Sequence, residues 1–208
     1  MQQDSEIIQH IYKSRVNILK QMKNLSYNTD AYENISITEV SHMHKNDQLD
    51  MILKKPNQTV YCKYLLNKSL RVSYIEEIIE ELFNIRALLT NNDSIILVTQ
   101  HTGTDTIKQY LRKLFTDRNY YISNRTLAQL QFNILDHVLV PKHTILTKSS
   151  IKEMQTRYNI NSSDALPEIS RFDPVSKALM LKPGEIVHIE RPSKTAVTGD
   201  YYRVCINK

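Results

Sequence analysis

The chain has 208 residues, which is enough for one large domain or two smaller domains that each bury a core. Hydrophobic residues make up 41% and charged residues 24%, values that exclude wholesale disorder and a coiled coil. No apolar run approaches the roughly 20 residues of a membrane helix, and the N-terminus has no signal-peptide pattern, so we expect a soluble, non-secreted protein. The net charge is +5, and the surplus is concentrated in residues 141–208. Because no Lys/Arg run occurs, any contact with nucleic acid requires a shaped surface.

Two cysteines, Cys62 and Cys205, lie far apart in the sequence and form no CxxC motif. Neither a zinc site nor a disulfide framework is predicted, and we expect two buried thiols in a reducing compartment. The sequence also contains no P-loop and no GxGxxG motif. It therefore predicts no metal and no cofactor.

The first 130 residues carry the pattern of one α/β domain. Residues 5–24 place their apolar side chains on one helical stripe and predict an amphipathic opening helix. Residues 59–66 and 94–99 predict strands, and a helical apolar repeat over 75–89 lies between them. This order is a βαβ unit, whose strands lie parallel with a right-handed crossover. A further amphipathic helix is predicted over 107–115.

Other parts of the chain have weaker patterns. Residues 31–58 are polar and predict no regular element before the turn "KKPNQT". A short helix is predicted around 125–131, followed by an extended segment that Pro141 interrupts. The next helix is predicted over about 150–158, where Ser150 and a glutamate three residues later have the spacing of a capping box.

The end of the chain predicts a second, compact and β-rich domain. Asp173 can cap a short helix whose first residue is Pro174, since a proline there loses only an amide hydrogen that has no partner. "KPGE" then turns the chain into the strand "IVHIE", and "YYRVCI" returns as the last strand of a hairpin.

Four segments in this part of the chain resemble one known family. "HVLVPKH" at 137–143, "LPEISRFDPV" at 166–175, "LKPGEIVHIERPSKT" at 181–195 and "YYRVCI" at 201–206 are similar, in this order, to the C-terminal domain of common subunit five of the nuclear RNA polymerases. Archaeal RNA polymerases have a counterpart that resembles this last domain alone. In the N-terminal half, "IILVTQHTGTDTIKQYL" at 95–111 resembles the eukaryotic jaw domain in order and place.

The resemblance implies two domains, an N-terminal α/β jaw at 1–136 with a restriction-endonuclease-like βαβ scaffold, and a small β-rich α+β assembly domain at 137–208. The assembly domain would dock on the largest polymerase subunit, and the jaw would flank downstream double-stranded DNA. The residues expected to contact the partner are Pro141, His143, Glu168, Arg171, Phe172, Asp173, Pro174, Arg191 and Arg203.

Several positions depart from the family pattern. Glu168 stands where a basic residue is usual, and Arg171 and Phe172 stand where small residues are usual. The loop glycine of the last hairpin is displaced to Gly199, so we expect a differently shaped loop. In the jaw, the Thr-Pro-Ser/Asp turn near DNA is replaced by residues 104–106, "TDT".

The loop from His101 to Thr106 follows a strand and precedes a helix N-terminus, where amide and hydroxyl groups favour phosphate. The expected nucleic-acid-binding residues are Thr102, Gly103, Thr104, Thr106, Lys108 and Arg112. Alternatively, Asp105 caps the helix while the hydroxyls face water, and its charge would repel phosphate. Any contact here would position a duplex without reading its sequence, because phosphates carry no sequence information.

Two enzymatic or metal-binding alternatives have weak support. Cleavage of DNA on the jaw scaffold needs clustered carboxylates beside a lysine such as Lys63, but Tyr61 stands where an acid is required and Asp50 is the only nearby candidate. His42 and His44 could project from one side of an extended segment and bind a metal ion. No further Cys, Asp or Glu ligand is at a suitable spacing close by, which favours two surface histidines.

We therefore expect a non-catalytic subunit of a multisubunit DNA-dependent RNA polymerase, with no small-molecule substrate and no membrane partner. A free-standing transcription regulator and, less favourably, a nuclease are the alternatives. The chain has no tryptophan and is rich in residues that AT-rich DNA encodes, which indicates a divergent copy from a large DNA virus. A viral protein would be found in the virion and host cytoplasm, and a cellular one in the nucleus.

Overall fold

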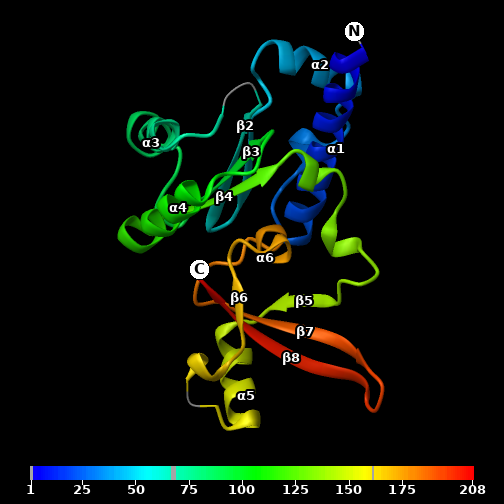
Figure 1. Cartoon of the computed structure of the whole chain (residues 1–208), viewed down its shortest axis with the longest axis vertical. Coiled ribbons are helices and arrows are strands. Elements are labelled where there is room, and N and C mark those ends of the chain that lie inside the picture. The colour runs from blue at the N-terminus through cyan, green and yellow to red at the C-terminus, as the bar shows by residue number, and fades with distance from the viewer. Residues whose placement is uncertain (1, 67–68, 161) are drawn as a thin grey trace. The chain divides into compact units, whose positions relative to one another are not determined.

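The computed structural model describes residues 2–66, 69–160 and 162–208. The chain divides into two compact units, Met1–Asn133 and Ile134–Lys208 (Figure 1). Each unit contains its own four-stranded sheet with helices, so the predicted mixed α/β and α+β class is confirmed. No helix in the described residues is both long and apolar enough to span a bilayer.

The N-terminal unit surrounds a mixed sheet with helices. Its elements in chain order are α1 (Gln2–Asn24), η1 (Asp30–Tyr32), α2 (Ile37–Lys45), β1 (Met51–Lys55), β2 (Gln58–Leu65), α3 (Val72–Ile79), the π-helix η2 (Glu80–Ile85), β3 (Ser94–Thr99), α4 (Asp105–Arg118), β4 (Tyr121–Thr126) and η3 (Ala128–Leu130).

The sheet of this unit has the order β1-β2-β3-β4, in which β1 and β2 form an antiparallel hairpin and β2, β3 and β4 run parallel. The predicted βαβ unit is thus present as β2, α3 and β3. All six residues of β3 are buried, which is the apolar pattern of a strand covered on both faces. Figure 1 shows α3 and α4 on one side of the sheet and α1 on the other.

Three elements of this unit differ from the sequence-based prediction. Strand β1 and helix α2 lie within residues 31–58, where the sequence predicts no regular element. Strand β4 occupies Tyr121–Thr126, and only a 3-10 turn at Ala128–Leu130 remains of the short helix predicted around 125–131. The residue pair His42 and His44 lies on α2, so the expected extended segment is wrong.

The C-terminal unit is a second sheet with short helices. Its elements are η4 (Ile134–Asp136), β5 (Lys142–Ile145), α5 (Lys148–Tyr158), η5 (Ser163–Ala165), β6 (Glu168–Ser170), α6 (Pro174–Ala178), β7 (Ile186–Ser193) and β8 (Val197–Ile206). The strand order is β5-β7-β8-β6, with β7 and β8 forming the predicted hairpin.

Apolar side chains cover both faces of this second sheet. On one face, Val187, Ile189 and Cys205 pack with Leu179 and with Val175 of α6. The other face has a separate buried cluster, which α5 completes: Met154, Leu166, Ile186 and Val204. The two faces follow from the alternation of side chains along β7 and β8.

Both predicted thiols are free and buried. Burial raises the pKa of Cys62 and of Cys205 to about 12, so both groups are protonated at neutral pH. A protonated thiol is a poor nucleophile and a poor metal ligand, and the two cysteines therefore serve as small core residues.

Candidate nucleic-acid and subunit interfaces

The loop between β3 and α4 is anchored at its start by Thr99, the last residue of β3. The Thr99 hydroxyl lies 2.8 Å from the carbonyl oxygen of His101 and 3.0 Å from Oδ1 of Asn124 on β4. Gly103 follows, and a β-carbon at this position would lie 2.8 Å from Nδ2 of Asn124. The loop therefore packs closely on β4, and any side chain at 103 would require Asn124 to shift.

Helix α4 begins with Thr104 as its N-cap, and the Thr104 side chain makes no capping hydrogen bond. Asp105 is the first helical residue and forms an ion pair with Lys108, at 2.9 Å between Oδ1 and Nζ. The hydrogen bond from Lys108 lowers the pKa of Asp105, which is exposed. Asp105 is thus not the cap that the alternative interpretation required, and it partly neutralises the lysine expected to attract phosphate.

The structure brings most of the predicted nucleic-acid-binding residues together. Thr102, Thr104, Thr106 and Lys108 are exposed on the loop and the first turn of α4. Arg112 lies one turn further along α4 and is half-buried. Three hydroxyl groups and one lysine are therefore the exposed hydrogen-bonding side chains among the predicted residues.

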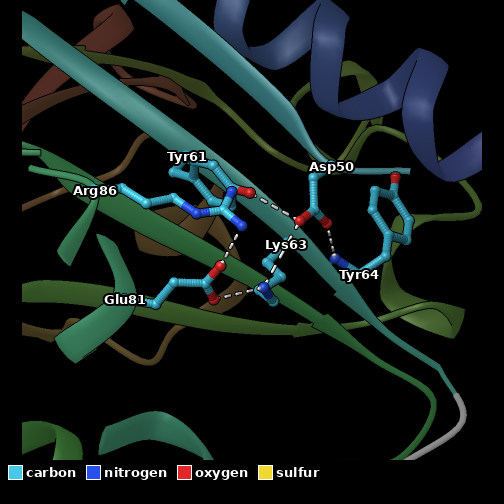
Figure 2. Close-up of polar contacts among 6 residues, drawn as sticks. All are labelled: Asp50, Tyr61, Lys63, Tyr64, Glu81 and Arg86. Atoms are coloured by element: carbon cyan, nitrogen blue, oxygen red, sulfur yellow. Dashed lines mark hydrogen bonds and ion pairs between the residues drawn. The ribbon is translucent and has the colours of Figure 1, made fainter. Parts of the chain in front are cut away.

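A polar cluster surrounds Lys63 on the sheet of the N-terminal unit (Figure 2). Its Nζ lies 3.8 Å from Asp50 and 3.5 Å from Glu81. Asp50 accepts hydrogen bonds from the Tyr61 hydroxyl at 2.8 Å and from the Tyr64 amide at 3.1 Å. The pKa of Tyr61 is raised, first by burial and then by its hydrogen bond to Asp50, so Tyr61 remains the donor.

Glu81 has no sequence signal that marks it as a member of this cluster. It lies in the π-helix η2, and its second oxygen accepts from Arg86 at 2.7 Å. Lys63 therefore lies between two carboxylates that already have partners, as Figure 2 shows. Within the described part of the chain, no group of three or more His, Cys, Asp or Glu side chains could hold a metal ion. The cluster joins β2 to η2 and does not have the ligand set of a nuclease centre.

In the C-terminal unit, Asp173 caps α6 as predicted. Its Oδ1 accepts from the amides of Val175 at 2.8 Å and Ser176 at 3.4 Å, and Pro174 occupies the first helical position. The predicted capping box at Ser150 is wrong, because α5 begins earlier and Thr147 is its N-cap.

Arg171 and Phe172 are less exposed than residues of a partner-binding surface are expected to be. The Arg171 side chain is only 2% exposed, donates to Asn207 at 3.1 Å and stacks on the ring of Phe172 at 5.2 Å. Arg171 therefore stabilises the domain from within, whereas Glu168 is exposed and lies 3.5 Å from Lys208. Phe172 is half-buried.

The segment with Pro141 is ordered by two histidines. His143 lies 2.6 Å from the carbonyl oxygen of Pro141 through Nδ1, and the amide of Leu139 donates to Nδ1 of His137 at 3.2 Å. Burial lowers the pKa of His143, which favours the neutral ring at physiological pH.

Arg191 and Arg203 lie around one tyrosine of the same sheet. The guanidinium carbon of Arg191 is 4.3 Å from the centre of the Tyr201 ring, and that of Arg203 is 5.5 Å away. Tyr201 is not among the predicted contact residues, although it lies in the segment "YYRVCI" that carries the resemblance. The aromatic platform that positions both arginines is visible only in the folded sheet.

Comparison with known proteins agrees with this architecture. The family model described as "RNA polymerase Rpb5, C-terminal domain" matches residues 132–205. The subunit rpabc1 of DNA-directed RNA polymerases I, II and III from Dictyostelium discoideum is 30% identical over 97% of this chain and 100% of its own length. Subunit Rpo5 of Thermococcus kodakarensis is 44% identical over 79 residues, which are 38% of this chain and 95% of that protein.

These matches define the chain as a non-catalytic subunit of a multisubunit DNA-directed RNA polymerase. It belongs to the family of common subunit five, with a match to the Dictyostelium relative that extends through both units. The protein is part of an enzyme complex in which catalysis belongs to other chains.

Proposed function

We propose that the C-terminal unit attaches this protein to the largest polymerase subunit, while the N-terminal unit flanks the downstream DNA duplex. The observation that carries the first part is the length of the shared segment. The Thermococcus relative is almost fully covered by a match of 79 residues, and the C-terminal family model matches residues 132–205. A polymerase subunit can therefore consist of little more than this segment. The segment is for that reason the natural site of attachment to the polymerase.

The surface of the C-terminal unit supports attachment. Arg191, Glu168 and Pro174 are exposed, and Pro141 and His143 are partly exposed on the same small unit. Interfaces gain specificity from such charged and rigid positions arranged on a packed domain. The residues that hold these positions in place, Asp173 and Arg171, act from inside the fold.

The loop before α4 supports contact with DNA. Its exposed hydroxyls can donate to phosphate oxygens beside the helix N-terminus, where the backbone dipole favours negative charge. Since Asp105 offsets the charge of Lys108, the loop would give a weak contact that guides the duplex. Such a contact suits a protein past which DNA must slide.

Purification of the full chain from its native source tests the attachment. We expect stoichiometric co-elution with the two large polymerase subunits through gel filtration and at moderate salt. Recovery of the chain as a free monomer would instead favour a free-standing transcription regulator. Elongation complexes reconstituted with and without this chain would then test the second part, through protection of downstream DNA from nuclease digestion.

We also propose a viral source, which rests on composition and on the departures at Glu168, Arg171 and Phe172. The protein would then be packaged in the virion and act in the host cytoplasm, whereas a cellular protein would act in the nucleus. Proteomics of purified virions, with quantification against the two large polymerase subunits, distinguishes the two locations.

A further inference from the structure

We infer that Arg191 and Arg203, positioned by Tyr201, form a carboxylate-binding site that receives an aspartate or glutamate side chain of the partner polymerase subunit. This inference rests on the proposed attachment through the C-terminal unit and names the chemistry of that contact.

The strand pairing places the three residues on one face of the sheet. In the antiparallel hairpin of β7 and β8, Ile189 lies opposite Tyr201, Val187 opposite Arg203 and Arg191 opposite Gly199. Side chains two residues apart along a strand share a face, and direct or diagonal neighbours across the pair are within reach of long side chains. The guanidinium carbons of Arg191 and Arg203 lie 4.3 Å and 5.5 Å from the centre of the Tyr201 ring, so both side chains contact this tyrosine.

Neither arginine has a carboxylate partner among the residues that the structure describes. The acids near them have other partners: Glu190 pairs with Lys142 at 2.9 Å, Asp200 lies 2.9 Å from His188, Glu168 lies 3.5 Å from Lys208, and the Asp173 carboxylate caps α6. Arg203 donates one bond, from Nη1 to the carbonyl oxygen of Glu168 at 3.3 Å.

The arginines also retain hydrogen-bonding capacity. Nε of Arg203 is buried and has no hydrogen-bond partner within the described residues. A donor without a partner is unfavourable, so the Arg203 guanidinium group gains from a further acceptor. The neighbouring His143, whose pKa is lowered by burial, adds no charge at neutral pH, so the positive charge of this face comes from the two arginines.

A carboxylate fits this site better than nucleic-acid phosphates do. A guanidinium group presents donors in a planar fork that matches a carboxylate, and stacking on Tyr201 restricts its orientation before binding. Affinity for a duplex depends on several neutralised phosphates, whereas this face offers two cations. Both guanidinium carbons lie within 5.5 Å of the centre of one ring, so we expect a single acidic side chain to engage both.

Substitution of the two arginines in the full chain tests the inference. Affinity for the polymerase lacking this chain would be measured with Arg191→Gln, with Arg203→Gln and with both together. We expect a loss of about tenfold for each single variant and more for the double variant, as is common for arginine anchors. Arg157→Gln is the matched control, because Arg157 lies near Asp200 at 3.9 Å and not at Tyr201. The control should change affinity less than about threefold.

Zero-length crosslinking identifies the partner group directly. Arg191→Lys and Arg203→Lys retain the positive charge, and a carbodiimide then joins the introduced amine to a carboxylate in contact with it. We expect mass spectrometry to find amide links to one aspartate or glutamate of the largest subunit. Arg157→Lys should give no such link.

The outcomes separate this inference from the proposed attachment. If the parent chain does not enter the polymerase, the proposed attachment fails and the inference with it. If the parent chain enters and the folded double variant enters equally well, only the carboxylate site is overturned. Links that are absent from both lysine variants, or a loss of DNA binding in place of polymerase binding, would also overturn it.

Discussion

Gly103 lies against Asn124, and a β-carbon at residue 103 would approach Nδ2 of that asparagine to 2.8 Å. Because Oδ1 of Asn124 also lies 3.0 Å from the Thr99 hydroxyl, a shift of the amide would weaken this hydrogen bond at the end of β3. We expect Gly103→Ala to lower the free energy of unfolding by about 1–3 kcal/mol, the usual cost of overpacking. Chemical denaturation followed by circular dichroism measures this change.

Gly199→Ala is the control for this prediction. A β-carbon at Gly199 would meet its nearest neighbours at 3.8 Å and 4.0 Å, which are ordinary contacts, so little change in stability is expected. Adding Asn124→Ala to Gly103→Ala should restore part of the loss by making room. Equal stability of Gly103→Ala and the parent protein would show that the loop does not need this glycine.

The tip of the β7–β8 hairpin has a strained residue. Val197 adopts a φ of 60°, the left-handed region that β-branched residues avoid, and it is 84% exposed. A valine therefore occupies a conformation that glycine favours. Val197→Gly should relieve about 1–2 kcal/mol of strain. After the entropy cost of glycine is subtracted, the variant should be more stable than the parent protein by up to about 1 kcal/mol.

Ala196→Gly provides the comparison for the hairpin. Ala196 is not among the described residues with positive φ, so glycine there brings only its entropy cost, about 0.5–1 kcal/mol of destabilisation. Thermal unfolding of both variants should therefore shift in opposite directions. A drop in the melting temperature of Val197→Gly similar to that of Ala196→Gly would contradict the interpretation of strain.

Apolar periodicity explains which elements of the fold can be predicted. Strand β3 is an uninterrupted apolar run, and the helices around it have one-sided stripes, so the sequence predicts the βαβ unit. Strand β4 escapes prediction because its buried residues include Ser123 and Arg125, which carry no strand pattern. Arg125 is buried because Gln21 of α1 accepts its hydrogen bond at 2.7 Å, a long-range pairing that local sequence does not encode.

The same limit applies to the sites. The cap at Asp173 follows from local spacing and is predicted correctly, whereas the Arg171 side chain is expected on a partner surface and is buried. Glu81 joins the Lys63 cluster through a π-helix, whose altered turn changes the direction of its side chains and has no sequence signature here. Local spacing predicts the cap at Asp173 correctly and the capping box at Ser150 wrongly, whereas contacts between distant segments have no local signal at all.

His143 makes the stability of the protein depend on pH. Burial lowers its pKa in the folded chain, so the unfolded chain, with a pKa of about 6.5, binds a proton more readily. The contribution of His143 is complete above about pH 6.5 and is lost as the pH falls from that value through the lower folded pKa. The free energy of unfolding, measured from mildly alkaline to mildly acidic pH, should fall less steeply in His143→Asn than in the parent protein. Parallel curves for the two proteins would exclude a contribution from His143.

The cap of α6 should contribute to stability and to assembly. Asp173→Ala removes the acceptor of the Val175 and Ser176 amides and should lower the free energy of unfolding by about 1 kcal/mol. Asp173→Asn retains a capping oxygen and should stay close to the parent protein. The Asp173→Ala, Pro174→Ala double variant should also enter the polymerase less efficiently in competition with the parent chain. If the destabilised double variant enters the polymerase as well as the parent chain, the cap contributes to stability and not to assembly.

The loop before α4 should affect DNA and leave assembly unchanged. Thr104→Ala with Lys108→Ala removes one exposed hydroxyl and one cation beside the helix N-terminus, while the Thr104 side chain makes no cap bond whose loss would unfold α4. Elongation complexes with this variant should lose downstream DNA at lower salt than the parent complexes, because fewer phosphate contacts remain. Lys113→Ala, an exposed lysine further along α4, is the matched control and should behave as the parent. The same salt dependence in all three complexes would show that the loop does not contact the duplex, whereas a defect in incorporation into the polymerase would assign these residues to assembly.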